Sequence, residues 1–504
     1  MGGITLHQSH RLGEGHVRST AHHADVIIIG AGIAGLAAAH LLIRAGLGVS
    51  VLEAEPRVGG RLATDTVDGF RLDRLGPLLN GAWPELTAPQ WPGALELREF
   101  APGVLVHGEG RRHLTGDPRS ARGALKAART LSSAPWPHRA PRTPGVSRMS
   151  RVSRAAGGSP APWASRTSWP TPSAYGSEPG APARGGGRGG AVTGAIDRAR
   201  LGAALSRLAA TDEARLLARP ERTAAEALPG TGLPARTVDG VLRPLLTALL
   251  SDPGLTTSSR YADLALRDYA RGGLCVPAGG SSALPDLLAA ALPPGTVRTG
   301  VHVTAVGITS VRTKEHGELG CRSLLLATGA GAAAELLPGL RVPAFHPVTV
   351  LHHTAPAPPP TGRSLVLDGD RSGPVAHTAV MSEVDPSRAP AGRALVTSTV
   401  LGAPPADLDR SVRAHLATLY GVPTERWELL AAHHDPEAVP AMEAPHDPRR
   451  PVRVLAGLYV CGDHRDTSSV RGALHSGRRA AEAILTDLAV PGAHEGGPGL
   501  PEAA

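Results

Sequence analysis

The sequence predicts an α/β protein whose N-terminal part folds as a Rossmann-like, dinucleotide-binding unit. Residues 25–29 begin with Asp25 and continue as an apolar, β-branched run, Val-Ile-Ile-Ile, that is typical of a buried parallel strand. The run leads through a glycine-rich turn into an Ala/Leu-rich helical segment, 36–45. Two glycines end that segment, and a second strand pattern, 49–52, follows them. Strand, helix and strand in this order predict a βαβ unit with parallel strands.

The turn after the first strand has the pattern G-x-G-x-x-G. Gly30 permits the tight turn, Gly32 lets the backbone approach a pyrophosphate, and Gly35 lets the helix pack on the strand. Ile33 and Ala34 open the helix, whose N-terminus offers unpaired N–H groups and a positive dipole end to phosphates. Such turns also occur in ordinary βα junctions. Here the strand, the helix and the acid described next all accompany the turn, which favours dinucleotide binding.

Glu53 is the expected ribose ligand, and Ala54 is expected to contact the cofactor beside it. The carboxylate stands at the tip of the second strand, 23 positions after Gly30, where it can accept hydrogen bonds from a ribose hydroxyl. An acid at this position favours an unphosphorylated ribose, as in FAD or NAD, over NADP.

The segment that follows Glu53 indicates which of these two cofactors, FAD or NAD, is bound. Arg57-Val-Gly-Gly-Arg61, together with the first turn, resembles the N-terminal signature of the flavin-dependent amine oxidoreductase superfamily. That superfamily includes amine oxidases, protoporphyrinogen oxidase and phytoene desaturases. The resemblance implies that Gly59 and Gly60 let a loop pass close to the FAD pyrophosphate. It also implies that Arg61 bridges two phosphate oxygens with its planar fork. In isolation these residues would indicate only a turn and a surface charge.

The C-terminal region carries a second motif that resembles the same superfamily. A short apolar strand, 457–461, ends in Gly462 and Asp463 and precedes a helical segment. By this resemblance Asp463 accepts a hydrogen bond from the ribityl chain of FAD. The start of the helix would face the pyrimidine edge of the flavin, where its dipole stabilises the negative charge of the reduced ring. The expected contacts there are Val470, Gly472 and Ala473.

A third, softer match lies between the two motifs. A glycine-containing turn at 276–284, a helical segment at 284–292 and a strand pattern at 297–306 resemble the return of such chains to the FAD domain. Val303 would stand where the superfamily places a backbone contact to adenine. An ordinary βαβ segment is the alternative for that residue.

The resemblance implies a three-piece, Rossmann-like FAD-binding domain of the glutathione-reductase or amine-oxidase type, interleaved with an α+β substrate domain. The FAD-binding pieces are expected at 24–90, 274–335 and 455–488. The substrate domain is expected at 91–131, at 196–273, which has helical spacing of apolar residues, and at 336–454. Disordered tails are expected at 1–23 and 489–504.

Length and composition narrow the class further. A chain of 504 residues can form two large domains, at about 100–200 residues each. It has no apolar run of about 18 residues and no secretory signal, so we expect a cytoplasmic protein for which peripheral membrane contact stays open. Three scattered cysteines, Cys275, Cys321 and Cys461, predict neither a disulfide framework nor a zinc site, and we expect no metal.

The net charge of +8 is concentrated in one unusual insert, residues 132–195. Between positions 132 and 193 there are eight arginines and one acid, which leaves about +1 for the rest of the chain. This distribution argues against a nucleic-acid partner. The insert contains no leucine or isoleucine and is rich in Arg, Pro, Gly and Ser, so it is predicted to be disordered. It is either a genuine linker or a stretch read out of frame from GC-rich codons.

In this superfamily the flavin takes a hydride from the substrate, so few catalytic side chains are expected, and none is assigned. Amine oxidases usually keep a lysine near flavin N5, but the matching region here, 341–354, has none. Aromatic residues make up only 3% of the chain, which argues against an aromatic cage for an amine. These departures favour an apolar, isoprenoid-like small-molecule substrate. The electron acceptor and the oligomeric state are not specified by the sequence.

Two further features bear on the chemistry. The stretch 68–76 resembles a D-x-G loop that lies near the flavin in the desaturase-like members, with its glycine one position late. Three strand histidines are candidate proton acceptors, although strand histidines are more often structural: His346, His352 and His353. The alternatives are a flavin amine oxidase, a non-catalytic binding protein like the GDP-dissociation inhibitors, and a nicotinamide-only dehydrogenase. The last would not explain Gly462 and Asp463.

Overall fold

The structure is a computed structural model that describes residues 24–87, 95–117 and 189–489. The predicted N-terminal tail, most of the C-terminal tail and the predicted insert up to residue 188 lie outside these ranges. Helix α4 (Gly189–Ala210) begins within the predicted insert and includes its last seven residues, 189–195. Extending an existing helix by one residue is far easier than nucleating one, so α4 continues beyond its recognisable apolar spacing.

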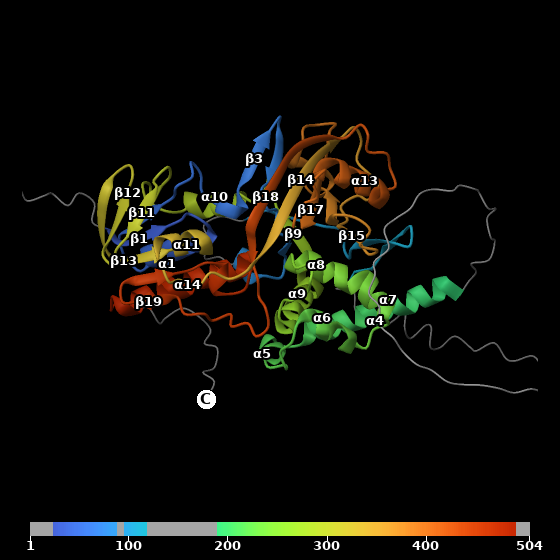
Figure 1. Cartoon of the computed structure of the whole chain (residues 1–504), viewed down its shortest axis with the longest axis horizontal. Coiled ribbons are helices and arrows are strands. Elements are labelled where there is room, and N and C mark those ends of the chain that lie inside the picture. Colours follow the sequence, from blue (N-terminus) through green and yellow to red (C-terminus); the bar gives the residue numbers. More distant parts are fainter. Residues whose placement is uncertain (1–23, 88–94, 118–188, 490–504) are drawn as a thin grey trace, which may run out of the picture.

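One sheet is built from three distant pieces of the chain, as Figure 1 shows on its left side. Its central strand, β1 (Ala24–Ile29), pairs in parallel with β2 (Val49–Leu52) and with β13 (Gly317–Leu326). β13 also pairs in parallel with β20 (Leu458–Val460) near the C-terminus. The sheet is completed by β10 (Val297–Arg298), β11 (Val303–Val306), β12 (Ser310–Thr313) and β19 (Arg453–Leu455).

Helices α1 (Ile33–Arg44) and α14 (Val470–Asp487) pack against each other on this sheet, although more than 400 positions separate them in the sequence. Their contact is close because both carry small residues there. A Cβ added at Gly477 of α14 would lie 2.2 Å from the carbonyl oxygen of Ala34 in α1. Helices α10 (Ala283–Ala290) and α11 (Ala330–Leu336) are the other helices of this part.

A second, seven-stranded sheet forms the frame of the other part. Its order is β18-β14-β17-β16-β15-β7-β8. The strands are β7 (Leu105–Gly108), β8 (Arg111–Leu114), β14 (Phe345–Ala355), β15 (Val366–Asp368), β16 (Val375–Val380), β17 (Ala394–Leu401) and β18 (Glu428–Pro440). Helix α13 (Leu408–Tyr420) covers one face, where Leu416 and Tyr420 pack with Leu351 and Val396. The opposite face is turned toward the site described below.

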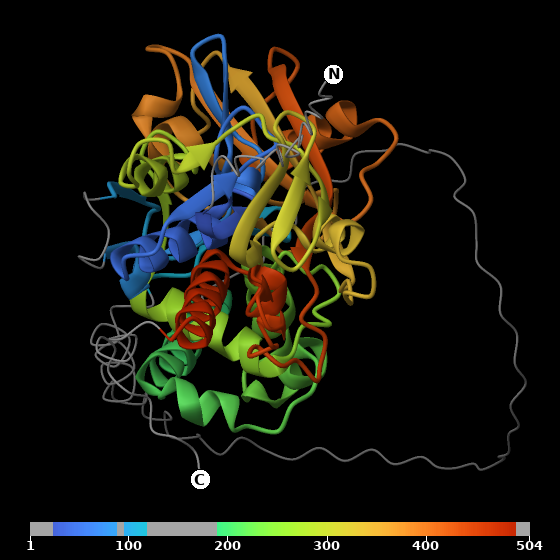
Figure 2. The same ribbon diagram turned by 90° about the vertical axis from the view of Figure 1, so that its left-hand side faces the viewer.

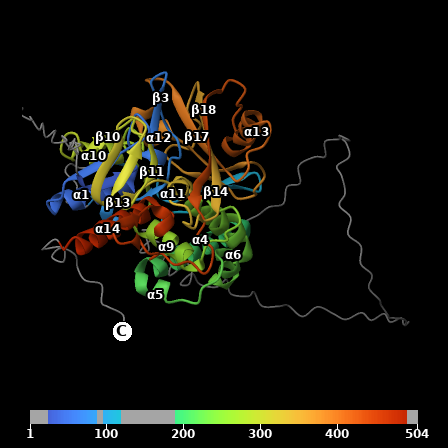
Figure 3. The same cartoon turned by 60° about the vertical axis from the view of Figure 1, so that its left-hand side comes forward.

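A group of helices lies on one side of both sheets, at the bottom of Figures 2 and 3. These are α4, α5 (Glu213–Leu217), α6 (Ala224–Ala227), α7 (Ala235–Thr237), a π-helical turn (Val238–Leu242), α8 (Arg243–Leu250) and α9 (Ser259–Gly272). Their buried leucines share one apolar cluster with Leu367 and Leu395 of the second sheet. This cluster fixes the helices to the seven-stranded sheet.

Short elements join the two parts. They are β3 (Thr64–Val67), β4 (Phe70–Asp73), β5 (Leu79–Asn80), α2 (Pro84–Thr87), β6 (Leu97–Glu99), β9 (Leu274–Pro277) and α12 (Met381–Val384). No helix within the described ranges is long and apolar enough to cross a membrane.

Candidate active site

The glycine turn between β1 and α1 has the geometry that its sequence predicts. Gly30 adopts φ +101°, and a Cβ there would lie 2.9 Å from the carbonyl oxygen of Ala327. A Cβ at Gly35 would lie only 2.2 Å from the carbonyl oxygen of Gly30, so a larger residue would push the helix off the strand. Gly32 differs, because its added Cβ would have no protein atom closer than 4.0 Å. This backbone is therefore open to a bound group.

Glu53 is held in a fixed orientation at the tip of β2. Its Oε2 accepts a hydrogen bond from the N–H of Ala31 at 2.7 Å, and its Oε1 accepts one from the N–H of Glu55 at 3.0 Å. The carboxylate thus stands beside the glycine turn, at the position from which the sequence predicts ribose binding.

Arg61 and Asp463, 402 positions apart, form an ion pair. Arg61 Nη2 donates to Asp463 Oδ1 at 2.6 Å, and Nη1 donates to the carbonyl oxygen of Ala438 at 2.5 Å. Burial would lower the pKa of Arg61, but Asp463, with Asp435 and Glu437, raises it above its ordinary value. The guanidinium therefore stays charged and is available to oxyanions. The two flavin motifs predicted from opposite ends of the chain meet here.

The start of α14 is stabilised by its own cap. The Ser469 side chain accepts a hydrogen bond from the N–H of Gly472 at 3.0 Å. A Cβ at Gly472 would lie 2.0 Å from the carbonyl oxygen of Thr467, so this glycine is required for close packing. Gly472 and Gly35 lie behind the wall of the site rather than on it. Gly35 thus has the packing role that the sequence predicts, and Gly472 packs closely against Thr467.

A cavity of about 1340 Å³ connects the glycine turn to the second sheet. Its volume exceeds the ~300–1,000 Å³ of ordinary small-molecule pockets, which leaves room for a dinucleotide and a substrate together. It is lined by most of the residues predicted to contact the cofactor: Gly30, Gly32, Ile33, Ala34, Glu53, Ala54, Gly59, Gly60, Arg61, Val303, Gly462, Asp463, Val470 and Ala473. These residues, with a charged guanidinium and an open glycine backbone, fit a flavin dinucleotide.

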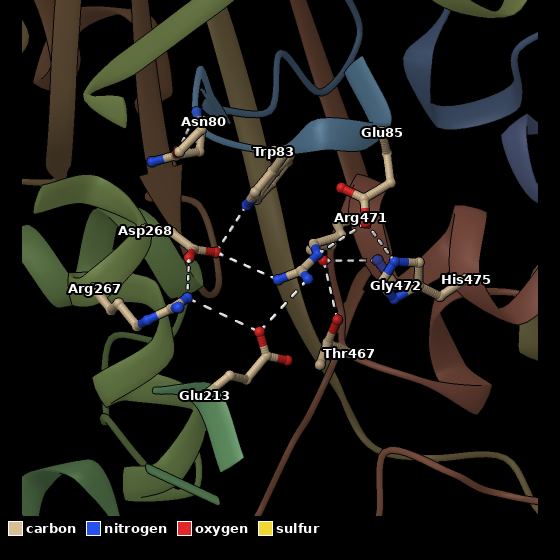
Figure 4. Close-up of polar contacts among 12 residues, drawn as sticks. Asn80, Trp83, Glu85, Glu213, Arg267, Asp268, Thr467, Arg471, Gly472 and His475 are labelled. Atoms are coloured by element: carbon tan, nitrogen blue, oxygen red, sulfur yellow. Dashed lines mark hydrogen bonds and ion pairs between the residues drawn. The ribbon is translucent and has the colours of Figure 1, made fainter. Parts of the chain in front are cut away.

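A network of charged side chains borders the cavity at the start of α14 (Figure 4). Arg471 lies 3.3 Å from Glu85, 3.6 Å from Glu213 and 3.8 Å from Asp268. His475 Nε2 lies 2.5 Å from Glu85 Oε1. Burial would raise the pKa of Glu85, but the hydrogen bond from His475 and the charge of Arg471 lower it to about 2. The network ties α14 to α2, α5 and α9.

Sequence reasoning missed this network because its acids come from three separate elements. Asp268 is further fixed by Trp83, whose Nε1 donates to Asp268 Oδ2 at 2.8 Å. Burial raises the pKa of Asp268 above its usual value. No local spacing links Glu85, Glu213 and Asp268, so only the fold brings them together.

The part of the cavity beyond the cofactor-binding residues is mainly apolar. Its lining includes leucines and other apolar side chains from the loop after β4, from the helices and from the second sheet: Leu75, Leu78, Leu217, Leu249, Leu264, Val348 and Met442. Gly76, in the D-x-G-like stretch, also lines it and adopts φ +60°. The loop thus forms part of the cavity wall.

Asp73 of the same stretch is buried away from the cavity. It accepts hydrogen bonds from Thr64 Oγ1 at 2.6 Å and from the N–H of Ser281 at 2.8 Å, and it pairs with Arg388. Burial would raise the pKa of Asp73, but Arg388 and these hydrogen bonds lower it below its usual range. Asp73 therefore anchors the loop rather than touching a ligand.

The three strand histidines do not line the cavity. His352 binds the carbonyl oxygen of Asp73 at 2.9 Å and Thr397 Oγ1 at 3.0 Å, and His353 binds Asp409 at 2.9 Å on the other face of β14. His346 lies 3.9 Å from Asp252. None of them is therefore placed to accept a proton in the pocket. His352 and His353 are buried against Asp73 and Asp409, on opposite faces of β14. A different histidine, His377 of β16, lines the cavity.

Comparison with known proteins identifies the family. The model of the family described as flavin containing amine oxidoreductase matches residues 190–485, more than half of the chain. The chain belongs to the flavin containing amine oxidoreductase family. A second model, of an NAD(P)-binding Rossmann-like domain, matches residues 28–86. Membership in this family of flavin-dependent oxidoreductases confirms the predicted family, the α/β fold class and the cofactor, which is FAD.

Individual relatives match over short segments. Putrescine oxidase of Kocuria rosea is 49% identical over 69 residues, and polyamine oxidase 3 of Oryza sativa subsp. japonica is 41% identical over 70 residues. Each match spans 14% of this chain and 14% of the relative.

Solved structures match over nearly the whole fold. An oxidoreductase from Methanosarcina mazei has a TM-score of 0.61 at 16% identity and covers 91% of this chain and 99% of its own. Putrescine oxidase bound to putrescine has a TM-score of 0.55 at 17% identity and covers 92% and 99%. These likenesses concern the fold.

Proposed function

We propose that this chain is an FAD-dependent oxidoreductase that removes a hydride from a small, largely apolar organic molecule. The observation that carries the proposal is the cavity, which joins a dinucleotide-binding turn at one end to an apolar lining at the other. A substrate in the apolar end would lie in the same enclosed space as the flavin.

The cofactor would be held by residues from all three pieces of its domain. Glu53 would accept hydrogen bonds from the ribose, and Arg61 would bind phosphate oxygens together with the N-terminus of α1. Asp463 would accept a hydrogen bond from the ribityl chain. To do so, its carboxylate must either bind Arg61 and the ribityl hydroxyl together or give up its bond to Arg61. The remaining proposed contacts are made by backbone and small side chains: Gly30, Gly32, Ile33, Ala34, Ala54, Gly59, Gly60, Val303, Gly462, Val470 and Ala473.

FAD supplies the hydride acceptor when it is bound, so the protein need not supply a strong acid or base. The apolar lining would exclude water and orient the C–H bond that is oxidised. The N-terminus of α14 would stabilise negative charge on the reduced ring. Arg471 would hold that helix in place through its three acids.

An apolar substrate is favoured because the charged side chains near the leucines already have partners. Glu213 and Asp268 both lie within 4 Å of Arg471. This leaves Leu75, Leu217 and the neighbouring apolar side chains as the surface that a substrate would contact.

Oxidation of an amine is the second candidate. The relatives named putrescine oxidase and polyamine oxidase support it, as do Asp435 and Glu437, which line the cavity near Arg61 and could attract a cation. Against it, both acids lie close enough to Arg61 to raise its pKa, so their charge is partly compensated.

Anaerobic reduction of the purified holoenzyme tests both candidates. Loss of visible flavin absorbance would be followed after adding putrescine, spermidine or the isoprenoid alcohol geraniol. Bleaching by geraniol but not by the amines supports the apolar substrate, and the reverse supports amine oxidation. An FAD-loaded protein that neither these nor a wider set of amines and isoprenoids reduces would contradict the proposed activity.

A further inference from the structure

His377 stands in the wall of the cavity on the substrate side. It lies in β16, with Leu367 of β15 and Thr399 of β17 as its neighbours across the strands. His377 is only 8% exposed, and both it and Thr399 line the cavity. The adjacent helix α8 contributes Ala248 and Leu249 to the same wall.

The His377 imidazole has no hydrogen-bond or ion-pair partner among the described residues. Its Nδ1 is completely enclosed and unpaired. Because Nδ1 is enclosed, the edge of the ring that carries Nε2 is the part that can face the cavity. A buried polar side chain without a partner is uncommon and calls for an explanation such as a functional role. A ligand in the cavity can therefore supply a partner for Nε2, whereas the enclosed Nδ1 stays out of its reach.

The surroundings of His377 favour a neutral ligand group. Burial lowers the pKa of His377 to about 4, and no charged group contributes to this shift. The imidazole is therefore neutral at neutral pH, with one nitrogen that donates and one that accepts. Such a ring pairs well with a hydroxyl or a carbonyl, whereas an ionised ligand group would lack a counter-charge there.

We infer that His377 is a substrate-binding residue that recognises a hydroxyl or carbonyl group on an otherwise apolar substrate. The inference rests on the proposed function and narrows it from an apolar molecule to one with a single neutral oxygen function. The leucines would bind the hydrocarbon body, and His377 would fix its orientation relative to the flavin.

A second histidine of the same sheet provides a matched control. His107 of β7 is 7% exposed, and its Nδ1 is also enclosed and unpaired among the described residues. It does not line the cavity. Replacing either histidine with leucine removes a buried imidazole from this sheet, but only His377→Leu changes the cavity wall.

The test uses two ten-carbon isoprenoids of similar shape, geraniol, which has a hydroxyl, and myrcene, which has none. Binding of each to the FAD-loaded full chain would be measured by equilibrium dialysis. One hydrogen bond predicts a preference of the wild type for geraniol of about two- to tenfold. His377→Leu should abolish the preference, His377→Gln should keep part of it, and His107→Leu should keep all of it.

The outcomes separate this inference from the proposed function. Equal binding of both compounds to the wild type, binding of neither, or an unchanged preference in His377→Leu would overturn the role of His377. Loss of the preference in His107→Leu as well would also overturn it, since the effect would then be structural. A wild-type protein that contains no FAD would instead refute the proposed function.

Discussion

Arg388 joins three segments that are distant in the sequence, at the start of the loop that follows β4, and its replacement should be strongly destabilising. The side chain is 2% exposed. It pairs with Asp73, donates from Nε to Asp385 Oδ2 at 3.2 Å, and donates from Nη2 to the carbonyl oxygen of Pro277 at 3.0 Å. Asp73 and Pro277 end strands β4 and β9, whereas Asp385 and Arg388 follow α12, between strands β16 and β17 of the seven-stranded sheet. The substitution Arg388→Met keeps most of the side-chain volume and removes the charge.

The expected loss in free energy of unfolding follows from the two carboxylates, Asp73 and Asp385, that remain buried without Arg388. Breaking a buried ion pair by removing one partner costs about 3–5 kcal/mol, because the other charge is left uncompensated. Here Asp73 would keep its hydrogen bonds from Thr64 and Ser281, and Asp385 would keep one from the N–H of Gly279 at 2.7 Å. These remaining donors place the expected loss near the lower end, at about 3 kcal/mol.

Chemical denaturation of the FAD-loaded protein measures this loss, with Arg98→Met as the control. Arg98 is 41% exposed at its side chain and lies 3.9 Å from the same Asp385, so its loss should cost less than about 1 kcal/mol. Equal destabilisation by the two substitutions would refute the reasoning.

The pH dependence of the Arg388→Met effect gives a second check. The lowered pKa of Asp73 contributes stability that is present above its unfolded pKa of about 3.9 and is lost as the pH falls. Without Arg388 this contribution is absent, and protonation of Asp73 removes the buried, unpaired negative charge. The difference in free energy of unfolding between wild type and Arg388→Met should therefore become smaller in acid. A difference that widens in acid would contradict this assignment.

Three further predictions concern the cofactor site and its support. Gly32→Ala should fold with unchanged stability but bind FAD more weakly. Gly35→Ala should instead destabilise the fold, because its Cβ would lie 2.2 Å from a backbone oxygen. Fluorescence titration with FAD measures the first effect, and thermal denaturation measures the second. Arg61→Met should weaken FAD binding by roughly tenfold or more, as expected when a charged hydrogen bond worth about 1.5–3 kcal/mol is lost; unchanged affinity would contradict its role. Burial would raise the pKa of Glu85, but its ion-pair partners lower it to about 2 in the folded protein, against about 4.3 in the unfolded chain. The contribution of ionised Glu85 to the free energy of unfolding is therefore complete above pH ~4.3 and is lost as the pH falls toward 2. Glu85→Gln should therefore flatten the acid limb of the stability curve, and an unchanged limb would count against the network.

The parts of the site that could be predicted from the sequence are those encoded locally. Gly30, Gly32 and Glu53 fall within one βαβ unit, where the spacing along the chain fixes their positions in space. Arg61 and Asp463 are identified as cofactor-binding residues because each segment carries its own motif, but the ion pair between them is not predicted from the sequence.

The remaining parts depend on tertiary packing, which leaves no local pattern. Arg388 meets Asp73 across 315 positions, and Arg471 meets Glu85 across 386. The histidines show the same limit. Strand alternation marks a buried face, but it does not tell which part of that face borders a cavity. His352 and His377 lie on the same face of the second sheet, and of these two only His377 lines the cavity.

The most direct test of the central claim is the visible absorption spectrum of the purified full-length protein, followed by acid release of its chromophore. We predict flavin absorption and release of about one FAD per chain, because three separated segments build one dinucleotide site. A folded protein that is colourless and fails to take up added FAD would contradict the account.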